Sequence, residues 1–468
     1  MRKYDLVIIG GGSAGLSAAE YGRKLGVRVA LIEKNKIGGD CTWTGCIPSK
    51  TLIETANLVH AIRGAAGHGL KVPEVEISFK KILQRVNQVV EDIYAQESPE
   101  VLRASGIDVY LGAARFLDHR TVSVGEEEVR GKHFVIATGA HAWIPPIPGL
   151  GEVDFLTYEH VWMLEELPER LVILGGGAVG VEFAQAFQRL GSRVTLLDAG
   201  SRLIKDADPR ASRLLQEILE SEGIRIHNQK LVDKVWRDED QITVQAGSLK
   251  ITADQLLLSV GRRPNVQGLD LEKAGVEYTP RGIEVNRKLE TSRSNIYAAG
   301  DCTGGPQFTH VAGWQAFNAV RNALLPGSVD PVLEHPPWTL FSDPEIAQVG
   351  LTSAQAREKF GDSVRVTHWP MQKVDRAHTA GAKQGFVQVV YKKNGQVLGA
   401  TVVSQRAGEL IHEWVLAITH DLKVGDIALA LHSYPSYAMA NMQTASEIQT
   451  SNALSGLQGK ALKLLAQG

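Results

Sequence analysis

The sequence predicts an α/β chain of several domains, in which two similar strand–helix–strand units precede a C-terminal α+β domain. The segment from Asp5 to Glu33 is echoed by the segment from Arg170 to Asp198. In each, a short apolar run leads into glycines, then into a helix-like stretch, a second strand-like run and an acidic residue. Beyond Pro336 the hydrophobic pattern changes, and 468 residues are too many for one hydrophobic core.

The glycines of the two units occupy equivalent places, and the first glycine precedes the acidic residue, Glu33 or Asp198, by 23 residues in both. Backbone amides at such a strand-to-helix turn hold the pyrophosphate of a dinucleotide, while the acidic residue binds ribose hydroxyls. The sequence therefore predicts two Rossmann-like dinucleotide-binding domains, one for each of two cofactors. The glycines expected to bind them are Gly10, Gly12 and Gly15 in the first unit and Gly175, Gly177 and Gly180 in the second.

The second unit's acidic residue bears on the choice of nicotinamide. Asp198 is followed by Ala199 rather than by a basic residue, and a carboxylate repels the 2′-phosphate of NADPH. NADH is therefore favoured. Arg202 and Lys205 follow closely in the sequence and leave NADPH open.

Between the two units the sequence predicts a helix from about Phe79 to Leu102 and strand-like pieces that end at Ala137-Thr138-Gly139. Prolines in the segment 145–148 mark a boundary, because stacked prolines continue neither a helix nor a central strand. The second unit is then expected to end near Asn265.

The region beyond Pro336 reads as a separate α+β domain. Strand-like runs from Phe386 to Tyr391 and from Val397 to Val403 are joined through Asn394-Gly395, a strong hairpin signal. Leu410, Ile411, Trp414, Val415 and Ile418 then follow helical spacing.

Composition excludes several classes of protein. A net charge of −2 gives no general attraction to nucleic acid or anionic lipid, and no apolar run has the charge-free length of a membrane span. A strand-like run begins a few residues after Met1, which leaves no room for a secretion signal. Three cysteines are too few for a disulfide framework, so we expect a cytoplasmic protein.

Two of these cysteines carry the chemistry. Cys41 and Cys46 lie just ahead of a helix expected to start near Pro48, and they are close enough to close a small disulfide ring. The helix N-terminus would stabilise the thiolate of Cys46. A zinc site would need two more soft ligands, whereas the only other cysteine is the isolated Cys302, read as a buried and inert side chain. No metal site is predicted.

With these motifs in place, the chain resembles the class I pyridine nucleotide-disulfide oxidoreductases, a family that includes glutathione reductase, dihydrolipoamide dehydrogenase and mercuric reductase. The resemblance spans nearly the whole chain. Besides the two glycine motifs, it is carried by the segments Gly39 to Lys50, Ala137-Thr138-Gly139, Gly261 to Asn265, Ala298 to Asp301 and Phe341 to Glu345.

The resemblance implies a domain order and a set of cofactor contacts. The expected domains are an FAD-binding domain in two parts, 1–147 and 269–335, an NAD(P)-binding domain, 148–268, and a dimerisation domain, 336–468. Asp301 resembles the aspartate that binds the ribityl or phosphate region of FAD. Further cofactor contacts are implied for Gly39, Thr138, Gly139, Gly261 and Arg262.

The resemblance also implies catalytic roles. Cys46 would face the flavin as a thiolate, and Cys41 would exchange with the electron acceptor. Lys50 would sit near the flavin N5, paired with Glu182. The C-terminal domain would form a homodimer, in which each active site is completed by the partner's tail.

The tail departs from the pattern of the disulfide reductases. Where these have a histidine as acid/base and a glutamate that orients it, this chain has Tyr434 and Met439. Tyrosine, with a pKa of about 10, is a poor proton acceptor at neutral pH. His432 is a second candidate, because residues two apart in an extended segment share a face and Pro435 favours an extended Tyr434. A histidine without any role at this surface is the alternative.

With a tyrosine at this place, the chain resembles the mercuric reductase branch of the family, whose acceptor is a metal ion. That enzyme delivers Hg(II) through a cysteine pair near its C-terminus, whereas this chain ends in the cysteine-free segment 461–468. The predicted function is an FAD-dependent NAD(P)H oxidoreductase that is mercuric-reductase-like and acts on a metal ion, a disulfide or another small electrophile. The alternatives are dihydrolipoamide dehydrogenase and a redox-sensing flavoprotein with little turnover.

Overall fold

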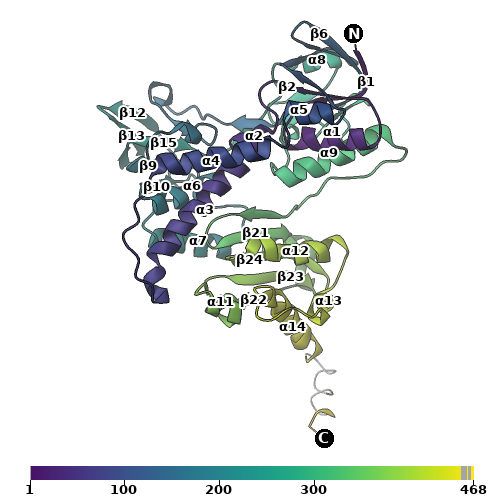
Figure 1. The fold of residues 1–468 in the computed structure, drawn as a ribbon. Helices are drawn as coiled ribbons and strands as arrows, with labels where there is room; N and C mark the ends of the chain where they lie inside the picture. The colour runs from purple at the N-terminus through teal and green to yellow at the C-terminus, as the bar shows by residue number, and fades with distance from the viewer. Residues whose placement is uncertain (1, 455–460, 462–464, 468) are drawn as a thin grey trace. The chain divides into compact units, whose positions relative to one another are not determined.

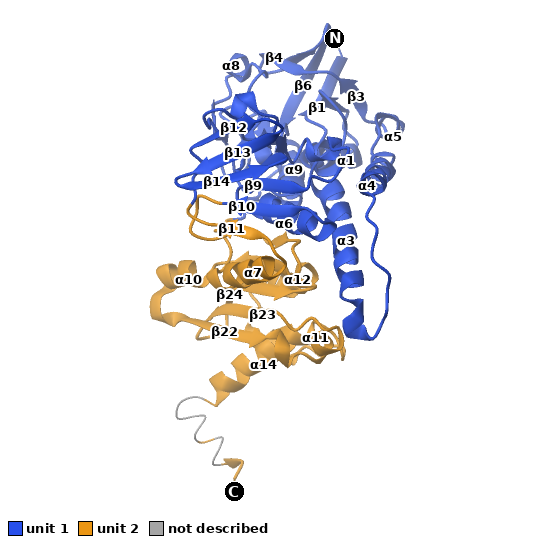
Figure 2. Cartoon of the chain, turned by 90° about the vertical axis from the view of Figure 1, so that its left-hand side faces the viewer, with its two compact units in different colours: residues 1–197, 230–333 blue, residues 198–229, 334–468 orange. Residues whose placement is uncertain are grey.

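The computed structural model describes residues 2–454, 461 and 465–467. The chain forms two compact units, coloured separately in Figure 2. Unit 1 comprises residues 1–197 and 230–333, and unit 2 comprises residues 198–229 and 334–468. The mixture of helices and strands confirms the predicted α/β class. The predicted boundaries at 147/148, 268/269 and 335/336 stay predictions.

The first sheet of unit 1 has the strand order β3-β2-β1-β6-β5-β4, and β19 also pairs with β6. The pairs among β1, β2, β3, β6 and β19 are parallel, whereas β4, β5 and β6 pair antiparallel. Strands buried on both faces need near-continuous apolar runs, as in Leu6 to Ile9. The strands are β1 (Arg2–Ile9), β2 (Val29–Glu33), β3 (Asp108–Leu111), β4 (Ala114–Asp118), β5 (Thr121–Val124), β6 (Glu127–Ile136) and β19 (Ile296–Ala298).

Two helices far apart in the sequence, α1 (Ser13–Lys24) and α9 (Thr309–Leu324), lie side by side (Figure 1). Small buried residues on both helices, among them Ala18 and Ala316, belong to one hydrophobic cluster with Leu6 and Ile8 of β1. Small side chains let the helices approach closely. The N-terminal turns of α1 and α9 are thereby brought to the same part of unit 1.

The second unit of the sequence repeat folds as predicted. Within unit 1 the strands of its sheet follow the order β10-β9-β15-β8, all parallel, and α6 follows β9 as α1 follows β1. A separate antiparallel sheet has the order β12-β13-β14. The elements are β8 (Leu156–Thr157), β9 (Arg170–Leu174), α6 (Ala178–Leu190), β10 (Arg193–Leu197), β12 (Lys234–Asp238), β13 (Gln241–Ala246), β14 (Leu249–Ala253) and β15 (Gln255–Leu258).

The helical region between residues 79 and 104 differs in detail from the prediction. One helix was expected from Phe79 to Leu102, but α4 (Phe79–Tyr94) ends before a second helix, α5 (Pro99–Ala104). The side chain of Ser98 caps α5, and Pro99 occupies its first turn, where a missing N–H costs nothing. The remaining elements of unit 1 are α2 (Gly39–Trp43), α3 (Cys46–Arg63), β7 (Ala140–Ala142), β16 (Arg262–Pro264), α8 (Leu271–Ala274), β17 (Tyr278–Thr279) and β18 (Gly282–Ile283), with short 3₁₀ turns η1 (Ala65–His68), η2 (Leu150–Glu152), η3 (Val161–Met163) and η4 (Asp301–Thr303).

Unit 2 is an α+β unit around an antiparallel sheet of order β20-β21-β24-β23-β22. The predicted hairpin is confirmed, with β23 (Phe386–Lys392) paired to β24 (Val397–Ser404) and Gly395 at φ 88° in the turn between them. The predicted helix is α12 (Ala407–Thr419), and its Trp414 is fully buried in the core. The other elements are α7 (Pro209–Ser221), β11 (Arg225–His227), β20 (Trp338–Leu340), β21 (Glu345–Gly350), α10 (Ser353–Phe360), η5 (Gly361–Ser363), β22 (Val364–Pro370), η6 (Met371–Lys373), α11 (Asp375–Thr379), α13 (Val424–Leu429) and α14 (Met439–Ala453).

Among the described residues, no helix combines the length and the apolar character needed to cross a membrane.

Candidate active site

The glycine loops of the two repeats have the same backbone geometry. Gly10 and Gly175 both adopt φ 109°, and a Cβ at either would lie within 2.4 Å of a backbone oxygen, that of Ala137 or Ser259. A Cβ at Gly15 would lie 1.8 Å from the oxygen of Gly10. Only glycine therefore fits at these positions, which lets the chain pass closely at the start of each helix.

The first loop fits the predicted dinucleotide. Helix α1 begins after Gly12, and no described side chain caps its N-terminus, which suits its first amides to binding a phosphate. Glu33 at the end of β2 is buried, and its two carboxylate oxygens accept from Gly11 N at 2.6 Å and Asn35 N at 2.7 Å. Each oxygen keeps a second acceptor site for a ribose hydroxyl. Gly12, Gly15 and Glu33 would hold FAD.

The second loop repeats this arrangement. Helix α6 begins after Gly177, again with no cap from a described side chain, and a Cβ at Gly180 would lie 1.9 Å from the oxygen of Gly175. These residues would hold the nicotinamide cofactor. Asp198, which directly follows β10, accepts from Gly200 N at 2.6 Å through its side chain.

The two cysteines lie on consecutive helices. Cys41 is in α2, and Cys46 is the first residue of α3, two residues earlier than the start expected near Pro48. The helix can begin there because Pro48 falls in its first turn, where no backbone N–H is needed. Both cysteines are half-buried free thiols in this structure.

The environment makes the two sulfur atoms chemically different. The hydrogen bond from Cys41 lowers the pKa of Cys46 to about 6, helped by Thr309 and the charge of Lys50 and opposed by burial. The Sγ of Cys46 lies 3.5 Å from the hydroxyl oxygen of Thr309. The same hydrogen bond and burial raise the pKa of Cys41. At neutral pH Cys46 is therefore the thiolate and Cys41 the thiol.

Lys50 and Glu182 form the ion pair that the resemblance implied. The Nζ of Lys50, one turn into α3, lies 2.7 Å from Oε2 of Glu182 in α6. The side chain of Glu182 is 8% exposed and that of Lys50 is 35% exposed. A positive charge is thereby fixed close to the thiolate of Cys46.

Two of the segments that carry the resemblance, 137–139 and 261–265, are hydrogen-bonded to each other. The hydroxyl of Thr138 donates to the carbonyl of Asn265 at 2.7 Å, and the amide of Asn265 donates to the carbonyl of Gly139 at 2.9 Å. Strands β7 and β16 pair antiparallel beside these hydrogen bonds, with Arg262 opposite Ala142. Gly261, at φ 130°, leads into β16.

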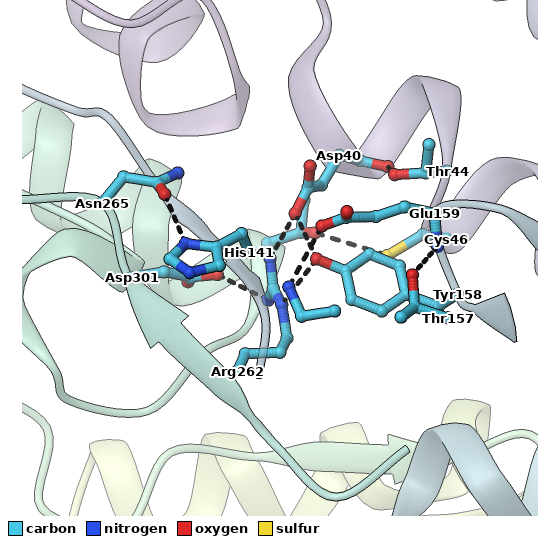
Figure 3. A network of polar contacts seen from close by, with 12 residues as sticks. Asp40, Thr44, Cys46, His141, Thr157, Tyr158, Glu159, Arg262, Asn265 and Asp301 are labelled. Atoms are coloured by element: carbon cyan, nitrogen blue, oxygen red, sulfur yellow. Dashed lines mark hydrogen bonds and ion pairs between the residues drawn. The ribbon is translucent and has the colours of Figure 1, made fainter. Parts of the chain in front are cut away.

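Arg262 lies at the centre of a polar network (Figure 3). Its guanidinium donates to Asp301 Oδ2 at 2.6 Å, to Asp40 Oδ2, and to the hydroxyl of Tyr158 at 3.1 Å. The hydroxyl of Tyr158 in turn donates to Asp40 at 2.9 Å. Burial raises the pKa of Asp301, against the effect of the Arg262 charge. Arg262 thus joins the predicted flavin-binding aspartate to the residue that precedes Cys41.

Sequence reasoning missed the partners that complete these sites. Asp40, Tyr158, Thr309 and Glu413 were not singled out, because their partners lie far away along the chain and no local pattern marks them. Only Asp40 carried a local signal, since it directly precedes Cys41.

The tail candidates His432 and Tyr434 contact different helices of unit 2. The ring nitrogens of His432 lie 2.8 Å from the carbonyl oxygen of Ala430 and 2.8 Å from Oε1 of Glu413 in α12. The hydroxyl of Tyr434 donates to Asp375 Oδ2 in α11 at 3.1 Å, and this contact raises the pKa of Tyr434. Each side chain is thus held by its own carboxylate, and the expected shared face stays a prediction. Met439, in the place of the family's glutamate, begins α14.

Cys302 is fully buried, and its thiol donates to the carbonyls of Ala299 at 3.3 Å and Ile136 at 3.4 Å. Burial raises the pKa of Cys302 to about 11. The thiol is thus held protonated, in line with the inert side chain that was predicted.

Comparison with known proteins matches the chain to two family models. Residues 4–316 match the model of the pyridine nucleotide-disulphide oxidoreductases, and residues 336–445 match the dimerisation domain of the same family. Together these models cover most of the chain.

Individual relatives give the same result. The chain is 36% identical over 441 residues to a mercuric reductase from Bacillus cereus, covering 93% of this chain and 70% of the relative. It is 35% identical to a dihydrolipoyl dehydrogenase from Thermus scotoductus, covering 96% and 98%. Among solved structures, the Cu(II) complex of RclA, an HOCl-induced flavoprotein disulfide reductase from Escherichia coli, is 30% identical, with a TM-score of 0.87 and coverage of 96% and 100%. The chain therefore belongs to the pyridine nucleotide-disulphide oxidoreductase family and is a flavoprotein oxidoreductase of that family.

Proposed function

We propose that this enzyme passes two electrons from a reduced nicotinamide, by way of bound FAD, to the Cys41–Cys46 pair and from there to a thiol-reactive metal ion. FAD supplies the two-electron carrier between the nicotinamide and the cysteines. The observation that carries the proposal is the unequal pair of sulfur atoms, a thiolate at Cys46 beside a thiol at Cys41. A metal ion deprotonates the thiol that coordinates it, so Cys41 can bind a soft cation and release its proton despite its raised pKa.

The chain's own residues have distinct parts in this proposal. Lys50, with Glu182 as its partner, holds a positive charge that stabilises the Cys46 thiolate. Thr309 donates to the same sulfur from the start of α9. Gly10, Gly12, Gly15, Gly39, Thr138, Gly139 and Asp301 would bind FAD, and Gly175, Gly177, Gly180, Gly261 and Arg262 would complete the two cofactor sites.

The tail supports a metal ion as acceptor. Reduction of a disulfide takes up two protons with two electrons, whereas reduction of two Cu(II) to Cu(I), or of Hg(II) to the metal, takes up none. The hydroxyl of Tyr434 donates to Asp375 and has a raised pKa, which makes it a poor proton carrier at neutral pH. A similar protein of known structure is a Cu(II) complex, and several relatives are mercuric reductases.

Dihydrolipoyl dehydrogenase is the second candidate. A relative with this name aligns over 96% of this chain and 98% of its own length. Tyr434 and Met439 disfavour it, because dithiol exchange needs an acid/base that neither residue supplies.

The test compares acceptors directly. Oxidation of NADH is measured with Cu(II), Hg(II), lipoamide and glutathione disulfide, in the wild type, in Tyr434→His and in Tyr437→His as a control three residues away. We expect turnover with metal ions to exceed that with disulfides, and Tyr434→His alone to raise disulfide turnover at least tenfold. Unchanged disulfide reduction in Tyr434→His would show that the account of the missing base is wrong.

The nicotinamide and the assembly are part of the same proposal. Asp198 favours NADH, so kcat/KM should be higher for NADH than for NADPH. Asp198→Ala should bring the two kcat/KM values closer together.

We propose a homodimer in which the partner's tail completes the site. The match to a dimerisation domain and the exposed Leu416, Leu429 and Leu431 of unit 2 support this assembly. Light scattering should give twice the 50.8 kDa chain mass. The small number of cysteines supports a cytoplasmic location for the enzyme.

A further inference from the structure

We propose that Arg262, Tyr158 and Trp162 are positioning residues for the redox segment, residues 40–46, and that their hold on this segment sets the equilibrium between the dithiol and disulfide forms of Cys41 and Cys46. The inference rests on the proposed function of the cysteine pair. It concerns three side chains whose hydrogen bonds go to Asp40 and Thr44, in the segment that carries both sulfur atoms.

The first set of hydrogen bonds is made to the side chain of Asp40. Its Oδ2 accepts from the guanidinium of Arg262 and, at 2.9 Å, from the hydroxyl of Tyr158 (Figure 3). Tyr158 is buried and the side chain of Arg262 is 21% exposed, whereas that of Asp40 is 40% exposed, so the two donors are shielded from water more than the carboxylate is. Charge-assisted hydrogen bonds under these conditions are stronger than surface ion pairs.

The backbone of Asp40 is in turn hydrogen-bonded to the turn between the two cysteines. Its backbone carbonyl accepts from Thr44 N at 3.0 Å and from Gly45 N at 2.5 Å, directly before Cys46. A Cβ at Gly45 would lie 2.9 Å from that carbonyl oxygen, so the turn is tightly folded against Asp40. One residue therefore orients Cys41, its neighbour in α2, and also fixes the start of α3 at Cys46.

The next hydrogen bond is made to the turn itself. The indole Nε1 of Trp162 donates to the carbonyl of Thr44 at 3.0 Å. The Trp162 ring packs on Phe183 of α6, with centroids 5.8 Å apart. Phe183 is adjacent to Glu182, so the residue that pairs with Lys50 and the residue that supports Trp162 lie on the same turn of α6.

Arg262 is itself fixed at its other end. Strand β16 pairs with β7, and the guanidinium bridges Asp40 to Asp301, whose Oδ2 lies 2.6 Å away and whose side chain is 13% exposed. The guanidinium therefore hydrogen-bonds to both carboxylates at once. The redox segment is thus tied to the loop after β19, which is predicted to bind the flavin.

This arrangement bears on the chemistry because a disulfide requires the sulfur atoms to lie about 2.05 Å apart, much closer than two thiols. Holding the segment keeps Cys41 and Cys46 at high effective concentration and favours ring closure. Loosening the segment should shift the equilibrium toward the dithiol. We expect a three- to tenfold smaller equilibrium constant for disulfide formation, which corresponds to about 15–30 mV.

The experiment equilibrates the purified full-length protein with glutathione buffers of graded ratio under argon. In this reaction two glutathione thiols reduce the Cys41–Cys46 disulfide, which yields two cysteine thiols and one glutathione disulfide. Free thiols are then alkylated and the protein is digested with trypsin. Both cysteines fall in the single tryptic peptide 37–50, which carries two alkyl groups when reduced and none when oxidised. This readout needs neither nicotinamide nor turnover.

The variants are Asp40→Asn, Arg262→Gln, Tyr158→Phe and Trp162→Phe, with Arg263→Gln as the matched control. Arg263 is the exposed neighbour of Arg262, and its guanidinium stacks on Trp143, 5.1 Å from the ring centroid, outside the network. All four test variants should shift the midpoint toward the dithiol, and Arg262→Lys should restore part of the shift. Tyr158→Phe and Trp162→Phe change no charge, so a shift in these two distinguishes positioning from a purely electrostatic effect.

The proposal would be overturned if the dithiol–disulfide midpoints of all four variants fell within the range of wild type and Arg263→Gln. Midpoints shifted toward the disulfide would overturn it as well. Should Arg262→Gln fail to fold, Tyr158→Phe, which removes one oxygen atom, decides alone. A wild-type pair that forms no disulfide in any buffer would instead refute the proposed function, so the two failures are distinguishable.

Discussion

The imidazole of His432 lies between two acceptors, with Nε2 2.8 Å from Oε1 of Glu413 and Nδ1 2.8 Å from the carbonyl oxygen of Ala430. The other carboxylate oxygen of Glu413 accepts from the buried Asn441, whose own oxygen accepts from the indole of Trp414. His432 is therefore connected to the core of unit 2 through α12, and the glutamate that orients it comes from that helix instead of from the tail.

Replacement of Glu413 by glutamine should destabilise the protein. A glutamine has one oxygen where the carboxylate has two, so either His432 or Asn441 loses its acceptor. We expect a decrease in the free energy of unfolding of about 1–2 kcal/mol. Urea denaturation followed by circular dichroism measures it, with the exposed Glu409 on the same helix as the control in Glu409→Gln. Equal stability of the two variants would contradict the role of the pair.

Cys46 should react as a thiolate well below the usual range. With a pKa of about 6, its alkylation rate by iodoacetamide in the reduced protein should reach half its maximum near pH 6, compared with about 8.5 for an ordinary cysteine. Cys41→Ala removes the largest stabilising contact and should move this midpoint upward. Lys50→Met should do so to a smaller extent, because it removes a charge at longer range. A midpoint near 8.5 in the wild type would refute the assignment.

The number of reactive thiols should change on unfolding. Cys302 is fully buried and its thiol is bonded to two carbonyls, so only Cys41 and Cys46 should react in the reduced native protein. In strong denaturant all three cysteines should react. Mass spectrometry after alkylation counts them, and three labels under native conditions would show that Cys302 is accessible.

Asp208 should be a major contributor to the stability of unit 2. It is buried, accepts from Arg210 N at 2.9 Å at the start of α7, and accepts from the amide of Gln388 in β23 at 2.7 Å. Asp208→Ala removes the cap and leaves a buried amide without this partner, so we expect a loss of about 2–3 kcal/mol. The exposed Asp206 is the control, since Asp206→Ala should change the free energy of unfolding by less than about 0.5 kcal/mol in the same assay.

The parts of the fold that rest on local patterns could be predicted from the sequence. The two glycine loops are alike down to φ 109° at Gly10 and Gly175, because close backbone approach can be met by one residue type only. The hairpin at Asn394-Gly395 and the helix around Trp414 follow from turn chemistry and from periodicity in the same way. The break between α4 and α5 was missed although Ser98-Pro99 marks it, since apolar periodicity outweighed the cap signal.

The contacts around the cysteines could not be predicted, because they join residues that are far apart in the sequence. Asp40 and Arg262 are separated by 222 positions, and Cys46 and Thr309 by 263. No periodicity relates such residues, and a single sequence shows no covariation. The resemblance supplied Lys50 and Glu182, but it was silent on Tyr158 and Glu413, which contact Asp40 and His432.

The pairing of β19 with β6 has a consequence for synthesis on the ribosome. Residues Phe134 to Ile136 of β6 find their second neighbour only in Ile296 to Ala298, about 160 residues later. At ordinary elongation rates the nascent strand waits roughly 10–30 s with one edge open, and open apolar edges promote aggregation. A prematurely terminated polypeptide that ends near residue 290 should therefore be a substrate for chaperones and proteases, whereas the completed chain closes this edge itself.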